Sequence, residues 1–286
     1  MTLNIGFIGP GIMGRPMALN LLKHGYSVSA YARKPDALRA LVEAGATACN
    51  TPAEAATRVD IVITMVSDTP DVEQVLFGEN GVIHGAMRGC IVVDMSTISP
   101  VATRSFAKRL ESFGIEMLDA PVSGGEIGAI NGSLSIMAGG KQEIFDKIRP
   151  VLECLGQSII LIGENGAGQV AKACNQIVAG ITIEAVAEAI SFAQRNGVDA
   201  AKVRTALLGG FAGSKILEVH GQRMLDLDFK PGFKVALHHK DMRIVMETAR
   251  QLGLSLPAAE LVTQHLNTLM EHGDAELDSS AIYTVV

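Results

Sequence analysis

Residues 4–23 read NIGFIGPGIMGRPMALNLLK, and this stretch decides the fold of the first half of the chain. Its first five residues are an apolar run typical of a buried parallel strand, and its last ten have the spacing of an amphipathic helix. Gly9, Gly11 and Gly14 between them match the pattern G-x-G-x-x-G in the setting that it requires. The first glycine permits a tight turn, the second lets the backbone approach a pyrophosphate, and the third lets the helix pack closely on the strand. The stretch therefore predicts a dinucleotide-binding domain of the Rossmann type rather than a merely structural glycine-rich turn.

The residues after the second predicted strand bear on the choice of dinucleotide. In NAD-binding proteins a carboxylate usually follows this strand and bonds the ribose 2′-hydroxyl. Here Ala32, Arg33 and Lys34 follow residues 27–31, so the position offers two cations and no carboxylate. A guanidinium can stack on adenine and bind a 2′-phosphate as a planar fork. The alternative is a solvated charge pair at a strand end. We expect NADP as the preferred cofactor, with NAD possible.

Strands and helices alternate as far as residue 163. We expect further strands at 60–66, 90–94, 116–119, 134–138 and 158–162, and helices at 35–43, 71–77, 100–113 and 142–154. In open α/β sheets, ligands bind beyond the carboxyl ends of the strands. This rule places several loops around one crevice. The expected cofactor contacts in this half are Gly9, Gly11, Ile12, Met13, Gly14, Arg33, Met65, Val66 and Thr97.

Ser123, Gly124 and Gly125 follow the strand at 116–119. A hydroxyl next to two unobstructed backbone N–H groups forms a nest that suits a small carboxylate. The other interpretation is an ordinary glycine-rich turn.

The longest apolar helical run extends from about residue 168 to 195. Residues three and four apart share one face of a helix, so Gly168, Lys172 and Asn175 lie on one stripe. One interpretation is a surface lysine at the start of a helix. The other is a catalytic lysine, with an amide one turn away to hold its ammonium group or a substrate oxygen.

The remaining residues show helical patterns only. We expect helices at 199–208, 214–225, 235–252 and 257–272, punctuated by glycines. The predicted fold is thus α/β: an N-terminal Rossmann dinucleotide-binding domain (1–163), followed by an all-α C-terminal domain (164–286) that the long helix joins to it. We expect the active site in the cleft between the two. The apolar face of residues 178–193 is either core or a subunit interface.

Composition excludes several classes of protein. The chain has 286 residues, 48% of them hydrophobic, which is ample for a buried core and untypical of disorder. Its net charge of −6, without a long basic run, argues against nucleic-acid binding. We also expect no membrane span, because charges interrupt every apolar run, and no metal, because no ligand cluster has the right spacing. Four scattered cysteines and the absence of a signal peptide favour a cytoplasmic location.

Four segments together resemble the β-hydroxyacid dehydrogenase family, in its order and across nearly the whole chain. They are residues 9–14, 119–125 (DAPVSGG, with Gly132, Leu134 and 139–140 after it), 166–175 (GAGQVAKACN) and 240–241 (KD). The resemblance implies that Lys172 is the catalytic acid/base. It implies that Ser123, Gly124 and Gly125 hold the substrate carboxylate with help from Asn175, and that Thr97 and Lys240 contact the cofactor near the active site.

Within the family, residues 78–81, 117–121, 209–214 and 229–233 are similar to the branch that reduces tartronate semialdehyde to glycerate. The resemblance therefore implies NAD(P)H-dependent reduction of a small aldehyde that carries a carboxylate, by a homodimer or homotetramer associated through the helical domain. One departure is Ala32, where members that use NAD carry Asp. Alternatives are oxidation of 3-hydroxyisobutyrate or reduction of succinic semialdehyde. A further alternative is an interaction module that binds a dinucleotide without catalysis, although the retained Lys172 argues against it.

Overall fold

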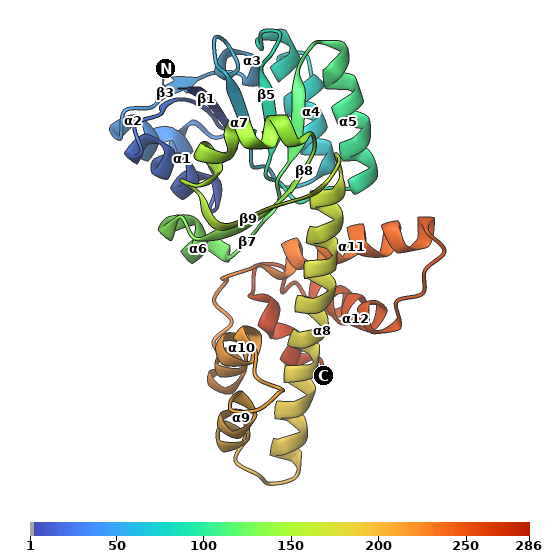
Figure 1. The fold of residues 1–286 in the computed structure, drawn as a ribbon. Coiled ribbons are helices and arrows are strands. Elements are labelled where there is room, and N and C mark those ends of the chain that lie inside the picture. Colours follow the sequence, from blue (N-terminus) through green and yellow to red (C-terminus); the bar gives the residue numbers. More distant parts are fainter. Residues whose placement is uncertain (1–2) are drawn as a thin grey trace. The chain divides into compact units, whose positions relative to one another are not determined.

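The computed structural model describes residues 3–286 as two compact units (Figure 1). Unit 1 extends to Lys172, and unit 2 comprises Ala173–Val286. Unit 1 is a sheet with helices on both faces, and unit 2 is helical, so the predicted fold class is confirmed.

Among residues 3–286, nine strands form one sheet in the order β3-β2-β1-β4-β5-β6-β8-β7, with β9 paired to β8. The strands are β1 (Asn4–Ile8), β2 (Ser27–Tyr31), β3 (Thr47–Cys49), β4 (Ile61–Thr64), β5 (Ile91–Asp94), β6 (Glu116–Asp119), β7 (Val122–Ser123), β8 (Leu134–Gly139) and β9 (Gly156–Gly163). The path from β3 to β6 is parallel, and β8 runs antiparallel to β6 and β7. The parallel part has the strand order 3-2-1-4-5-6 of a Rossmann sheet.

The central strands are continuous apolar runs because both faces of the sheet are covered. Side chains alternate between the two faces: Phe7, Ile63 and Val93 belong to one core cluster, whereas Val62 and Val92 belong to the other. Because these strands are parallel, the loops that follow their carboxyl ends meet at one edge of the sheet. The candidate site lies at this edge.

The helices of unit 1 cover these two cores. They are α1 (Gly14–Lys23), η1 (Pro35–Leu38), α2 (Arg39–Glu43), α3 (Pro52–Ala55), α4 (Thr69–Phe77), η2 (Val82–His84), α5 (Pro100–Ser112), α6 (Gly125–Asn131) and α7 (Gln142–Leu152). Several begin at a side-chain cap: the Asp68 carboxylate accepts from Thr69 N at the start of α4, and the Ser99 hydroxyl accepts from Ala102 N at the start of α5.

Unit 2 packs around the C-terminal part of α8 (Ala167–Arg195). Its other helices are α9 (Ala200–Leu208), α10 (Lys215–Asp226), α11 (Val235–Gln251), α12 (Pro257–Glu271) and the 3-10 turn η3 (Ser279–Thr284). Its core joins one apolar face of each, for example Val186 and Ile190 of α8, Met224 of α10, Met242 of α11 and Leu266 of α12. Each helix thus buries a stripe and exposes its polar side.

Helix α8 bears on the expectation that the chain has no membrane span. By length and composition its 29 residues could cross a membrane, and 44% of its most apolar window is buried inside the structure. Lys172, Glu184 and Glu188 interrupt the helix, as expected, but the composition of α8 alone does not exclude a span. A helix that forms the core of a domain passes the same test, and α8 contributes Ile183, Val186, Ala187 and Ile190 to the core of unit 2.

Candidate active site

The glycine-rich loop of unit 1 borders a cavity of about 480 Å³ at the carboxyl ends of β1, β2, β3 and β4. Gly9 has φ +94°, and a Cβ there would lie 2.3 Å from the carbonyl oxygen of Met65. A Cβ at Gly14 would lie 2.2 Å from the carbonyl oxygen of Gly9, which explains the close approach of α1 to β1. A Cβ at Gly11 would meet no described atom within 4 Å, so its backbone faces open space. Only glycine fits the first and third positions, and the second leaves room for a ligand.

Five of the residues predicted to bind the cofactor line this cavity: Gly9, Gly11, Arg33, Met65 and Val66. Ile12, Met13, Gly14 and Thr97 do not line it, and Ile12 is 52% exposed. The cavity also takes Asn50 and Thr51 from the end of β3, which the sequence analysis did not single out. The open backbone at Gly11 and the two cations that line the cavity, Arg33 and Lys34, suit a dinucleotide.

A buried carboxylate ties the ends of β4 and β5 together. Asp94 Oδ1 accepts hydrogen bonds from Thr64 Oγ1 (2.8 Å) and from Ser96 N (3.2 Å), and Ser96 Oγ accepts from Val66 N (2.9 Å). Burial raises the pKa of Asp94 to about 6, against the hydrogen bonds from Ser96 and Thr64 that lower it. This network fixes the loop that carries Thr97.

A second buried carboxylate, Asp119 at the end of β6, holds the first turn of α8. Its Oδ1 accepts from Gly166 N (2.7 Å) and its Oδ2 from Gln169 N (3.0 Å). Two N–H groups that the helix leaves unpaired are satisfied in this way. Burial again raises the pKa, to about 6, although the backbone hydrogen bonds oppose it. A Cβ at Gly168 would lie 2.2 Å from the carbonyl oxygen of Met137, so only glycine lets the helix start this close to the sheet.

Gln169 links the same turn to the loop after β5. Its Nε2 donates to the Ser96 carbonyl (2.8 Å), and its Oε1 accepts from Ile98 N (3.1 Å). The Gln169 side-chain amide thus bonds the backbone of both neighbours of Thr97. Lys172 follows three residues later on the same helix and is buried, with 7% of its surface exposed. The interpretation of Lys172 as a surface lysine is therefore wrong.

Ser123 ends β7, and Gly124 and Gly125 begin α6. Both glycines have positive φ, +137° and +61°, and both are exposed. The pair therefore forms a sharp turn with open backbone, and the half-buried Ser123 stands next to it. Asp119 lies four residues before Ser123. The end of β6 therefore both holds the start of α8, through the Asp119 carboxylate, and leads into this turn.

Within unit 2, two buried side chains, Gln176 and Asp241, connect the half-buried Asn175 with the half-buried Lys240. Asn175 Nδ2 donates to Gln176 Oε1 (2.8 Å), Gln176 Nε2 donates to Asp241 Oδ2 (2.7 Å), and Lys240 Nζ pairs with Asp241 Oδ1 (2.7 Å). The Asp241 carboxylate accepts only, so it orients the Gln176 amide, which in turn orients the Asn175 amide. Neither Gln169 nor Gln176 was predicted from the sequence. Their signal is their spacing, three before and four after Lys172, in an otherwise apolar helix.

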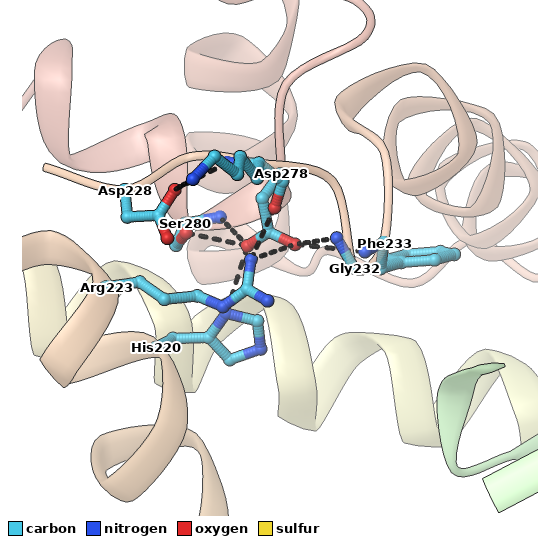
Figure 2. Close-up of polar contacts among 8 residues, drawn as sticks. His220, Arg223, Asp228, Gly232, Phe233, Asp278 and Ser280 are labelled. Carbon is cyan, nitrogen blue, oxygen red and sulfur yellow. Dashed lines mark hydrogen bonds and ion pairs between the residues drawn. The ribbon is translucent and has the colours of Figure 1, made fainter. Parts of the chain in front are cut away.

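A separate network organises the loop before α11 (Figure 2). Asp278, fully buried, accepts from Gly232 N and Phe233 N (2.9 Å each) and from Ser280 N and Oγ, and it pairs with Arg223 Nη1 at 3.2 Å. His220 Nδ1 lies 3.3 Å from its Oδ1. Burial alone would raise the pKa of Asp278, but these donors hold it well below the ordinary value. Phe233, which the carboxylate holds by its backbone, packs at 5.7 Å from the ring of His238.

Residues 3–286 contain no cluster of three or more His, Cys, Asp or Glu side chains that could hold a metal ion. The four cysteines carry free thiols, as expected; Cys174 is the exposed one.

Known proteins match both units. The family model described as the NAD binding domain of 6-phosphogluconate dehydrogenase matches residues 4–163. The one described as the NAD-binding domain of NADP-dependent 3-hydroxyisobutyrate dehydrogenase matches residues 166–286.

Two relatives and one solved structure illustrate the likeness. The 2-hydroxy-3-oxopropionate reductase of Escherichia coli is 47% identical over 280 residues, which cover 98% of this chain and 96% of that protein. The NAD-dependent L-serine dehydrogenase of Pseudomonas aeruginosa is 35% identical, with coverage of 97% and 96%. The structure of Mycobacterium tuberculosis 3-hydroxyisobutyrate dehydrogenase with L-serine has a TM-score of 0.91 at 32% identity, and covers 100% of this chain and 99% of that one. The chain belongs to the β-hydroxyacid dehydrogenase family of NAD(P)-dependent oxidoreductases.

Proposed function

We propose that this enzyme reduces tartronate semialdehyde (2-hydroxy-3-oxopropanoate) to glycerate with NAD(P)H, and NADPH in preference to NADH. The observation that carries the proposal is the 47% identity, over almost the full length of both chains, with a 2-hydroxy-3-oxopropionate reductase. The buried Lys172, the open turn at Ser123 and the cavity at Gly9 and Arg33 support it.

In the proposed mechanism the bound nicotinamide supplies the hydride. Lys172 donates a proton to the carbonyl oxygen as that oxygen takes on negative charge, and accepts the proton in the reverse direction. Ser123, Gly124 and Gly125 hold the substrate carboxylate through the hydroxyl and the backbone N–H groups. We assign to Asn175 an assisting role toward the substrate.

The remaining proposed residues hold the cofactor. Gly9, Gly11, Ile12, Met13 and Gly14 form the loop for the pyrophosphate. Arg33, Met65, Val66, Thr97 and Lys240 complete the set. The Lys240 ammonium is already oriented by Asp241, with which it pairs at 2.7 Å.

The test is the initial rate of NADPH and NADH oxidation by purified protein with tartronate semialdehyde, with succinic semialdehyde in parallel. Fast oxidation with the first aldehyde and slow oxidation with the second supports the proposal. No oxidation with either aldehyde, despite measurable NADPH binding, excludes the reductase and favours another β-hydroxy acid as substrate or a module without catalysis.

A second candidate is the oxidation of 3-hydroxyisobutyrate. It is favoured by the likeness to the M. tuberculosis 3-hydroxyisobutyrate dehydrogenase, at a TM-score of 0.91. Reduction of NADP⁺ or NAD⁺ with 3-hydroxyisobutyrate, compared with glycerate and L-serine, separates the candidates, because kcat/KM ranks competing substrates of one site.

We also propose a homodimer or homotetramer that associates through unit 2. Helix α8 exposes Val178 (66%) and Phe192 (72%), and Phe192 borders an apolar groove with Ala185, Ala189, Val198 and Val203. Exposed apolar surface of this kind is typical of an interface. Light scattering should give a multimer, and Phe192→Asp should shift it toward the monomer.

Free thiols at all four cysteines agree with a reducing compartment, for which we propose the cytoplasm.

A further inference from the structure

A carboxylate from another element stands beside Arg33 in the cavity of unit 1. Asp71 lies in the first turn of α4, whereas Arg33 follows β2, and both line the cavity. Arg33 Nη1 donates to Asp71 Oδ1 at 3.1 Å. The Asp71 side chain is 29% exposed and that of Arg33 74%, so the carboxylate is the better-anchored partner.

This pairing bears on the choice between the two dinucleotides. A 2′-phosphate needs the guanidinium that Asp71 already engages, since both are anions that bind the same fork of N–H groups. The phosphate would also bring a second negative charge close to the carboxylate. NADH has only a hydroxyl at this position and leaves the pair intact.

We propose that Asp71 is a selectivity-determining residue that moderates the preference for NADPH by competing with the 2′-phosphate for Arg33. The inference rests on the proposed role of Arg33 as the contact of the phosphate. The proposed competition explains why the cavity contains Asp71 beside the two cations that follow β2, Arg33 and Lys34, which suit a 2′-phosphate. Exposed ion pairs are weak, so the effect on binding is about two- to fivefold.

The experiment measures dissociation constants of NADPH and NADH by nicotinamide fluorescence, at low ionic strength, for the wild type and Asp71→Asn. The variant should bind NADPH about two- to fivefold more tightly and NADH as before. Glu73→Gln is the matched control: Glu73 lies on the same helix, pairs with Arg109 at 2.6 Å and does not line the cavity. Its NADPH affinity should equal that of the wild type. An unchanged or weaker NADPH affinity of Asp71→Asn would overturn the proposal, as would an equal gain in the control.

Arg33→Ala and the double variant separate the role of Arg33 as the phosphate contact from the competition by Asp71. Arg33→Ala should weaken NADPH binding and not NADH binding, and Asp71→Asn should then add a clearly smaller gain in NADPH affinity, because only the repulsion between the carboxylate and the phosphate remains to be relieved. If Arg33→Ala leaves NADPH affinity unchanged, the role of Arg33 is wrong and the inference fails with it. If Arg33→Ala weakens NADPH but the Asp71 gain persists in full, Asp71 acts without Arg33 and the competition is refuted. Neither result bears on the reductase activity, which the aldehyde assay tests independently.

Discussion

At the scale of the residue, Lys172 is an ionisable side chain in a buried position. Lysines are almost never fully buried unless they are paired, because removing an ammonium group from water is costly. This lysine is 7% exposed and follows the turn that Asp119 and Gln169 fix to the ends of β5 and β6. The position suits a proton donor whose place must be defined.

Lys172→Ala should therefore remove turnover and leave cofactor binding nearly unchanged. General acid–base catalysis contributes about 10²–10⁴-fold, so we expect kcat to fall by that factor. The measurement is kcat with the aldehyde, beside the NADPH dissociation constant from fluorescence. Lys202→Ala, at a side chain that is 86% exposed, serves as the control and should retain full activity. Turnover that survives in Lys172→Ala would show that the proton comes from elsewhere.

Asp94→Asn should change how stability depends on pH. The pKa of Asp94 is raised in the folded state to about 6, so the stability linked to its protonated form is fully present below about pH 4 and is lost as the pH rises through 6. Asparagine does not ionise and avoids this loss. Between pH 4 and 7.5 the free energy of unfolding of the variant should gain on that of the wild type by up to about 3 kcal/mol. Denaturant titrations at four pH values measure this. Asp36→Asn, at an exposed side chain, serves as the control, and its free energy of unfolding should change with pH as that of the wild type does. The same pH dependence in Asp94→Asn and the wild type would refute the raised pKa of Asp94.

At the scale of the element, helix α8 was the most predictable part of the chain. The expected range of 168–195 differs from the observed Ala167–Arg195 by one residue, because a long apolar periodic run leaves few alternatives. Its anchoring was not predictable, since Asp119 and Gly166 are 47 residues apart in sequence. Local patterns hold no information about which strand end meets a helix start. The same reason hid β7, whose two residues are too few for any periodicity.

Asp119→Asn tests whether that anchor positions Lys172. One of the two oxygens becomes an NH₂ group that faces a backbone N–H, so one hydrogen bond is lost and a repulsion replaces it. We expect a fall in kcat with NADPH affinity preserved, while at neutral pH the lost hydrogen bond and the relief of the buried charge act on stability in opposite directions. Assays well below the melting temperature separate the two effects. Glu116→Gln, on the same strand and paired with the exposed Lys141, should leave kcat unchanged. A variant that loses stability and keeps wild-type kcat would restrict Asp119 to a structural role.

At the scale of the whole molecule, most strands and helices followed from the sequence, whereas the short elements β3, α3, β7 and α6 and the polar networks did not. The Rossmann half and the helical half are confirmed because apolar periodicity and glycine punctuation specify them. The buried carboxylates Asp94, Asp119 and Asp278 escaped the sequence analysis as networks, since each is built from donors on several elements. Their environments differ: the first two lie in unit 1 with raised pKa values, and the third lies in unit 2 with a lowered one.

This contrast predicts that acid weakens unit 2 before unit 1. As the pH falls from 7 to about 4, Asp94 and Asp119 take up protons and unit 1 gains stability. Asp278 contributes its stability above its ordinary pKa, and this is lost as the pH falls below about 4, so unit 2 loses stability there. Amide hydrogen exchange, corrected for the intrinsic rate at each pH, should show residues 173–286 losing protection first. In Asp278→Asn the loss should already appear at pH 7, by about 1–3 kcal/mol, because one oxygen that accepts hydrogen bonds and pairs with Arg223 or His220 is replaced by an NH₂ group. Glu276→Gln, whose side chain is 77% exposed and pairs with Lys234, should behave as the wild type. Earlier loss of protection in residues 3–172 would contradict the order and the carboxylate environments from which it follows.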